Sequence, residues 1–161
     1  MNRAERLFIA LDFPSAEPAR ELARSLSSMG VGLKLGLELF TAEGPSLAAE
    51  LAEAAPLFLD LKFHDIPNTV AGAISRVAGL GTAMTNIHLS GGEAMARAAV
   101  RARDASGSSM KLIGVTVLTS LDSGDLESVW GSELDASQVV LRFARLARDW
   151  GLDLLVEFRR F

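Results

Sequence analysis

Cysteine and tyrosine are absent from this sequence of 161 residues, and aromatic residues make up only 6% of it. Without cysteine there can be neither a disulfide framework nor a thiolate metal site. Basic residues are also outnumbered, because 16 Lys and Arg face 20 Asp and Glu and leave a net charge of −4. Broad binding to nucleic acid requires a basic face, so we expect no nucleic-acid partner.

Long apolar runs are missing as well. No segment approaches the roughly 20 apolar residues that span a bilayer, so we expect no membrane contact. Residues 1–6 are charged and lead into only a short apolar run, which is too short for a signal peptide. These absences predict a cytoplasmic protein. The length and the 49% of hydrophobic residues predict a single domain over residues 1–161.

Apolar strands alternate with amphipathic helices along the whole chain. The strands are predicted over residues 7–11, 32–36, 57–62, 84–89, 111–118 and 152–156. The intervening helices are predicted to begin near residues 14, 45 and 67 and to run over about 93–105 and 139–150, after a polar insertion that starts at 119. Strands that are apolar on both faces are typical of a parallel sheet covered by helices. Either a doubly wound sheet or a (β/α)8 barrel fits this pattern.

Polar side chains at the ends of these strands favour the barrel. They are Asp12, Lys34, Asp60, Lys62, Thr119 and Ser120, with Asp65 just beyond. Reactive groups that converge from several successive strands are typical of the top face of a barrel, whereas an open sheet gathers its site at one switch point. We therefore predict an α/β fold of the (β/α)8 TIM-barrel type. No Gly-x-Gly-x-x-Gly or P-loop motif is present, so no nucleotide cofactor is expected.

The stretch 60–69, Asp-Leu-Lys-Phe-His-Asp-Ile-Pro-Asn-Thr, concentrates charge at the end of a buried strand. Asp60 and Lys62 are two residues apart, so they are predicted to share one strand face, with apolar neighbours on the other. Asp65 follows in a loop, and Pro67 suits the first turn of a helix. A lysine between two carboxylates keeps its proton, so Lys62 could serve as a general acid. On spacing alone, a structural ion pair is an equal alternative.

This stretch resembles the signature of the orotidine 5′-monophosphate decarboxylase family. Residues 10–12, 34–36 and 118–120 are similar to segments that the family places around its substrate, and the resemblance covers about residues 5–153. It implies the decarboxylation of orotidine 5′-monophosphate to uridine 5′-monophosphate in pyrimidine biosynthesis. It also implies that neither a cofactor nor a metal takes part.

The resemblance implies roles for the charged residues. Lys62 would donate a proton to C6 of the pyrimidine as CO2 leaves, and Asp60 would stand near the substrate carboxylate and hold Lys62. Lys34 would also pair with Asp60. Asp65 and Thr69 would reach into the site of a partner subunit, because the family builds each site across a homodimer.

Further residues are expected around the substrate by the same resemblance. Lys34 and Asp12 would hold ribose hydroxyls, and Thr119 and Ser120 would bind the pyrimidine edge. The other signature residues expected to line the site are Leu61, Phe63, His64, Ile66, Pro67 and Asn68. We interpret His64 as a loop or interface residue and His88 as a hydrogen-bonded structural residue. The pair Gly91-Gly92 fits either a phosphate cradle or a tight turn.

The sequence predicts about six of the eight βα units of such a barrel, which takes 200 residues or more. Family members hold the substrate phosphate after strands seven and eight, and residues 156–161 differ from the small, neutral residues of the family. We therefore expect weakened activity, and open sheet edges at the first and sixth strands.

Two other functions are alternatives. One is a Mg2+-dependent sugar-phosphate decarboxylase of the same superfamily, which resembles this chain in its Asp-x-Lys-x-x-Asp core. In that group a carboxylate in the second strand binds the metal, whereas Lys34 stands at the comparable position here and would repel a cation. The other alternative is a non-catalytic chain that binds a nucleotide or a longer partner.

Overall fold

The computed structural model describes residues 7–130 and 135–156, and these form one sheet of parallel strands. The strands are β1 (Phe8–Ala10), β2 (Gly32–Gly36), β3 (Leu57–Phe63), β4 (Met84–His88), β5 (Lys111–Val115) and β6 (Leu154–Val156). They lie side by side in sequence order, and each neighbouring pair is parallel. Sequential order is the order of a (β/α)8 barrel, whereas a doubly wound sheet reverses it. The barrel-type prediction is confirmed, with β1 and β6 at the edges of the described sheet.

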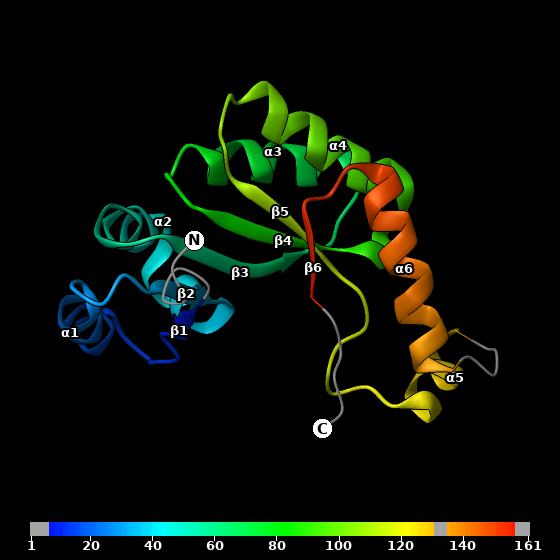
Figure 1. The fold of residues 1–161 in the computed structure, drawn as a ribbon, viewed down its shortest axis with the longest axis horizontal. Coiled ribbons are helices and arrows are strands. Elements are labelled where there is room, and N and C mark those ends of the chain that lie inside the picture. Colours follow the sequence, from blue (N-terminus) through cyan, green and yellow to red (C-terminus); the bar gives the residue numbers. More distant parts are fainter. Residues whose placement is uncertain (1–6, 131–134, 157–161) are drawn as a thin grey trace.

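Helices connect the strands and follow the outer side of the curved sheet (Figure 1). They are α1 (Ala16–Leu26), α2 (Leu37–Ala54), α3 (Pro67–Ala78), α4 (Gly92–Ala105), α5 (Ser123–Trp130) and α6 (Ala136–Trp150), with a short 3-10 turn, η2 (Leu89–Gly91), before α4. This arrangement leaves the loops after the carboxyl ends of the strands together at one end of the sheet.

The main core lies between the sheet and the helices. Leu33 and Leu35 of β2 and Leu57 and Leu59 of β3 alternate along their strands and are at most 1% exposed. They pack in one cluster with helix residues such as Ile74 of α3. Burying a side chain of this size stabilises the fold by about 1.5–3 kcal/mol. A second, smaller cluster joins α5 to α6 through Val117, Leu126 and Val139.

Several element boundaries differ from the sequence prediction. Helix α2 begins at Leu37, earlier than the predicted start near residue 45, but it consists of two helical segments that meet in a kink at Gly44, with φ of +75°, so its second segment begins where the helix was predicted. Strand β5 ends at Val115, three residues before the predicted end at 118. The polar insertion contains helix α5, which was not predicted. Strand β6 begins at Leu154, two residues later than predicted.

Within the described residues, no helix is both long and apolar enough to cross a bilayer. Two expectations concern residues outside the described ranges. One is the argument against a signal peptide at residues 1–6, and the other is the difference from the family in the segment 157–161.

Candidate active site

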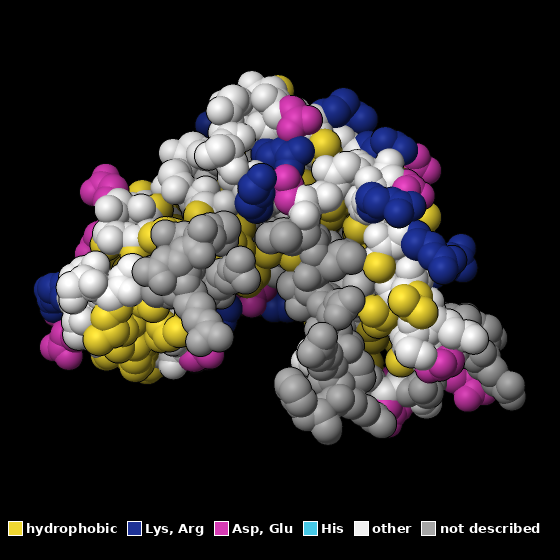
Figure 2. All heavy atoms as spheres, viewed as in Figure 1, with side chains coloured by type: hydrophobic (Ala, Val, Ile, Leu, Met, Phe, Trp, Pro, Cys, Tyr) yellow, Lys and Arg dark blue, Asp and Glu magenta, His cyan; other side chains and the backbone are white. Residues whose placement is uncertain are grey.

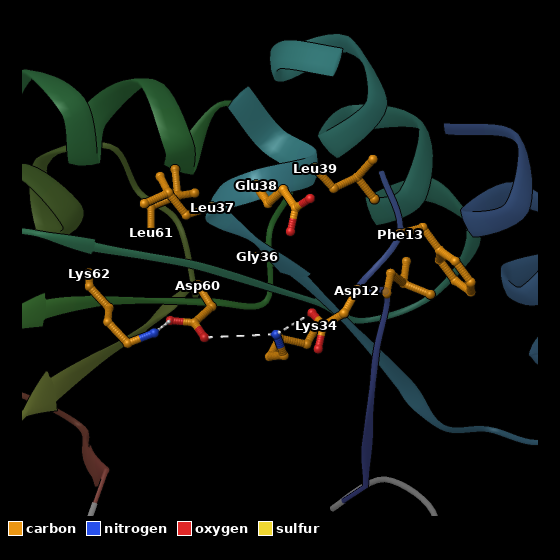
Figure 3. A pocket seen from close by; sticks show the side chains of 11 residues that line it. Asp12, Phe13, Lys34, Gly36, Leu37, Glu38, Leu39, Asp60, Leu61 and Lys62 are labelled. Atoms are coloured by element: carbon orange, nitrogen blue, oxygen red, sulfur yellow. Dashed lines mark hydrogen bonds and ion pairs between the residues drawn. The ribbon is translucent and has the colours of Figure 1, made fainter. Parts of the chain in front are cut away.

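Charged side chains from three neighbouring strands meet at the carboxyl end of the sheet (Figure 3). Asp12 follows β1, Lys34 lies in β2, and Asp60 and Lys62 lie in β3. They line a cavity of about 220 Å3 together with Leu61 and six other residues, Leu11, Phe13, Gly36, Leu37, Glu38 and Leu39. Parallel strands bring their carboxyl ends to one edge, so residues that are far apart in sequence become neighbours.

Asp60 is the centre of this charged row. Its Oδ1 lies 2.7 Å from Lys62 Nζ, and its Oδ2 lies 4.0 Å from Lys34 Nζ. Lys34 Nζ is also 3.1 Å from Asp12 Oδ1. Burial opposes ionisation of Asp60, but hydrogen bonds from Lys62 and Asn86 and the charges of Lys62 and Lys34 outweigh it, so its pKa lies below the ordinary value. The two ammonium groups are therefore bridged by an ionised carboxylate.

Lys62 has an unusual backbone. Its φ is +52°, and it is the one non-glycine residue with a positive φ in the described chain. For an L-residue this left-handed conformation costs about 1–2 kcal/mol. The register between β3 and β4 shifts between Leu59 and Phe63, so the regular alternation of faces ends before Lys62. Leu61 and Phe63, predicted on the opposite face, are partly buried and pack against the main core.

Asn86 of β4 belongs to the same cluster and was not identified as a site residue from the sequence. It is 1% exposed. Its Nδ2 donates to Asp60 Oδ1 at 2.6 Å, and its Oδ1 accepts from Lys62 N at 2.7 Å. The available signal was a polar residue inside the apolar fourth strand, since a buried amide needs hydrogen-bonding partners.

Asp65 lies in the loop after β3. Asp65 is exposed, its Oδ1 accepts a hydrogen bond from Ile66 N at 2.6 Å, and no ion pair with Lys62 occurs among the described residues. Within the described chain Lys62 therefore pairs with Asp60 alone of the two carboxylates, and a role for Asp65 in the site of a partner subunit stays a prediction. Asp65 lines a second cavity of about 730 Å3, which also includes Lys62, His64 and Thr69.

The other predicted site residues occupy different positions. Phe63 lines the second cavity, and Leu61 lines both. Ile66 and Pro67 form the start of α3, with Pro67 as its first residue, as predicted, and Asn68 next. Thr119 and Ser120 are exposed in the loop after β5, and neither lines either of these two cavities in the described structure.

The two histidines lie against each other where the β3–α3 loop meets β4. The ring centroids of His64 and His88 are 5.3 Å apart. A side chain added at Gly91 would collide with Met95 and would lie 3.1 Å from the His64 ring. The close packing around Gly91 supports the tight-turn interpretation of the Gly91-Gly92 pair.

The environment of His88 predicts a pH-dependent stability. Burial and the positive charges of His64 and Lys62 hold the pKa of His88 below its ordinary 6.5, against the opposing effect of Asp60. As pH falls below about 6.5, the unfolded chain takes up this proton before the folded chain does. The free energy of unfolding should therefore decrease over that window.

Urea unfolding at a series of pH values between 7.5 and 5 would measure this decrease. His88→Asn should weaken the dependence of the free energy of unfolding on pH. His64 is the other histidine of the chain, so an NMR titration can follow the two imidazoles separately. An unchanged slope in His88→Asn would contradict the assignment.

Comparison with known proteins shows the family to which the chain belongs. The family model described as "Orotidine 5'-phosphate decarboxylase / HUMPS family" matches residues 5–157. The chain belongs to this family. An orotidine 5'-phosphate decarboxylase from Dichelobacter nodosus is 52% identical over 151 residues, which is 93% of this chain and 66% of that protein. Another, from Halorhodospira halophila, is 48% identical over 152 residues, 94% of this chain and 64% of the relative.

Two solved structures show the same fold. The orotidine 5'-phosphate decarboxylase of Lactobacillus acidophilus matches with a TM-score of 0.86 and 33% identity, over 92% of this chain and 69% of that one. An uncharacterized conserved protein from Geobacillus kaustophilus matches with a TM-score of 0.88 and 37% identity, over 94% and 73%. The chain thus spans about two thirds of the length of the curated relatives that it matches.

Proposed function

We propose that this chain catalyses the decarboxylation of orotidine 5′-monophosphate to uridine 5′-monophosphate, a step of pyrimidine biosynthesis. The observation that carries the proposal is the contact between Lys62 Nζ and Asp60 Oδ1, 2.7 Å apart beside a cavity at the carboxyl end of β3. The relatives from Dichelobacter nodosus and Halorhodospira halophila, which carry this enzyme's name, are 52% and 48% identical to the chain.

Lys62 is the proton donor in this proposal. Loss of CO2 breaks the bond to C6 and leaves its electron pair on that ring carbon, where no carbonyl group delocalises it. The Lys62 ammonium stabilises the developing negative charge and then gives its proton to C6, and the resulting amine regains a proton from water. Asp60 keeps the ammonium in place, and its charge repels the substrate carboxylate more strongly than neutral CO2.

The remaining residues of the site bind the substrate in this proposal. Lys34 and Asp12, 3.1 Å apart on neighbouring strands, hold ribose hydroxyls. Thr119 and Ser120 contact the pyrimidine edge, and residues 61–69 form the wall on the side of β3. No metal or cofactor takes part.

Lys34 distinguishes this proposal from a Mg2+-dependent sugar-phosphate decarboxylase. Its ammonium lies 3.1 Å from Asp12 and 4.0 Å from Asp60. A divalent cation bound by these two carboxylates would have to displace it against charge repulsion. Turnover that depends on added Mg2+ and disappears with EDTA would favour the metal-dependent alternative.

A homodimer with shared sites is part of the proposal. Asp65 makes no ion pair with its own Lys62 among the described residues, and Ile66 beside it is 67% exposed, as an apolar residue at a subunit contact would be. In a dimer, Asp65 and Thr69 of one subunit would complete the site of the other.

Mixing two inactive variants tests the shared site. In an equimolar mixture of Lys62→Ala and Asp65→Ala chains, half of the dimers are mixed and each of these has one intact site, so about 25% of the wild-type turnover should return. Each variant alone serves as the control. No recovery, with subunit exchange shown by mass spectrometry, would count against a shared site.

The purified chain and orotidine 5′-monophosphate are sufficient to test the activity, by following the loss of substrate absorbance. Binding of uridine 5′-monophosphate without turnover would favour the non-catalytic alternative. The single-domain organisation and the cytoplasmic location stay predictions.

A further inference from the structure

We infer that Asn86 is a positioning residue that sets both the backbone of Lys62 and the rotation of the Asp60 carboxylate. The inference rests on the proposed function, because it concerns how the proton donor and its partner carboxylate are held. Asn86 does not line the cavity of about 220 Å3, so it acts through the two residues that do.

The orientation of the Asn86 amide is fixed by its partners. A backbone N–H can only donate, so the atom 2.7 Å from Lys62 N must be the amide oxygen. An ionised carboxylate can only accept, so the atom 2.6 Å from Asp60 Oδ1 must be the amide nitrogen. One buried side chain therefore connects the backbone of the lysine to the carboxylate that pairs with its ammonium.

The backbone of β3 explains why such a connection is needed. The ladder pairs Leu59 with Thr85 and next pairs Phe63 with Ile87, so β3 advances four residues while β4 advances two. Lys62 lies inside this bulge with φ of +52°, a conformation that persists only where neighbours hold it. The Asn86 side chain accepts the Lys62 N–H, in place of a backbone carbonyl of the partner strand.

The Asp60 carboxylate is oriented by the same side chain. Oδ1 accepts hydrogen bonds from both Lys62 Nζ and Asn86 Nδ2, at 2.7 and 2.6 Å. Asp60 Oδ2 lies 4.0 Å from Lys34 Nζ and points towards β2 (Figure 3). Because Oδ1 already accepts two hydrogen bonds from the protein, Oδ2 is the oxygen that would face the reacting carboxylate of a substrate.

Amide hydrogen exchange tests the inference without any measurement of activity. Asn86→Leu removes the acceptor for Lys62 N–H, so the protection of this amide should fall at least about tenfold. Asn86→Asp keeps an acceptor oxygen, so its protection should stay near the wild-type value. Thr85→Val is the matched control, because Thr85 is a neighbouring buried polar residue whose hydroxyl bonds to Leu59 O and not to the site.

Steady-state kinetics of the same variants provide a second test of the inference. Asn86→Leu should lower kcat at least about tenfold at every pH and change KM less than about threefold, because geometry at the reacting atoms is lost. In Asn86→Asp the introduced carboxyl can replace the amide donor only while it is protonated. Its kcat should therefore fall as pH rises through the pKa of that carboxyl, which the adjacent Asp60 raises.

Wild-type protection of the Lys62 amide in Asn86→Leu, with the amides of β5 showing an intact sheet, would overturn the inference. A kcat for Asn86→Asp that declines no more steeply with pH than wild type would overturn it as well. Absence of turnover in the wild-type chain would contradict the proposed function. The amide hydrogen exchange of Lys62 would still decide whether Asn86 holds the Lys62 backbone.

Discussion

Lys62→Ala is expected to lower kcat for orotidine 5′-monophosphate by about 10²–10⁴-fold or more, since the variant lacks the proposed general acid and the cation that the proposal places beside C6. The side chain of Lys62 is 40% exposed, so its loss should leave the fold intact. Circular dichroism and steady-state kinetics on the same preparation measure both effects.

Lys111→Ala is the matched control for this variant. Lys111 is an exposed lysine at the start of β5, where it pairs with Asp153 at 3.3 Å, and it takes no part in the site. Its replacement should leave kcat within about twofold of wild type, since a surface ion pair contributes little. Substantial residual turnover in Lys62→Ala would remove Lys62 from the role of proton donor.

Asp60→Asn should have the second largest effect, at least about a hundredfold loss of kcat. The substitution keeps the shape of the side chain but removes the charge that holds Lys62 and lies near Lys34. It also sets a second amide against Asn86, whose Nδ2 then loses its charged acceptor. Leaving these groups poorly paired should cost about 1–3 kcal/mol in the free energy of unfolding.

The pH dependence of this stability loss has a defined sign. Because the pKa of Asp60 is lowered in the folded chain, its charge contributes stability above the ordinary value of 3.8, and this contribution is lost as pH falls through the folded pKa. Urea unfolding should therefore separate wild type from Asp60→Asn at pH 7 and bring the two together in acid. Asp104→Asn, an exposed carboxylate on α4, is the control. A difference that persists unchanged into strong acid would contradict the pairing.

Much of the fold is predictable because apolar strands and amphipathic helices leave periodic signals. The bounds of β2 match the prediction, since Gly32 and Gly36 flank a short run of large residues. Strand β5 is shorter than predicted because Thr116 and Val117, although buried like strand residues, lie beyond its end at Val115. The helical segment before Gly44 escapes prediction because a single glycine fits both the start of a helix and a bend within one.

The candidate site was partly predictable for a similar reason. Asp12, Lys34, Asp60 and Lys62 follow or lie in strands, and parallel strands of known order place their ends together. Asn86 was missed because its importance comes from contacts with β3, 24 and 26 residues away in sequence.

The conformation of Lys62 shows a limit of reasoning from residue types. A positive φ is usually predicted from glycine or asparagine, and a lysine gives no such signal. The conformation arises from the mismatch in register between β3 and β4, which only the paired strands reveal. The regular alternation of faces is therefore interrupted at the residue that the proposal makes the proton donor, although Lys62 contacts Asp60 as predicted.

The central claim is that this chain releases CO2 from orotidine 5′-monophosphate with Lys62 as the acid. The most direct measurement is the release of labelled CO2 from carboxyl-labelled substrate by the purified wild-type chain, with EDTA present. We expect CO2 release in equal amount to uridine 5′-monophosphate by the wild-type chain, and near-complete loss of this release in Lys62→Ala. No release above the uncatalysed rate by folded wild-type chain, or equal release by Lys62→Ala, would contradict it.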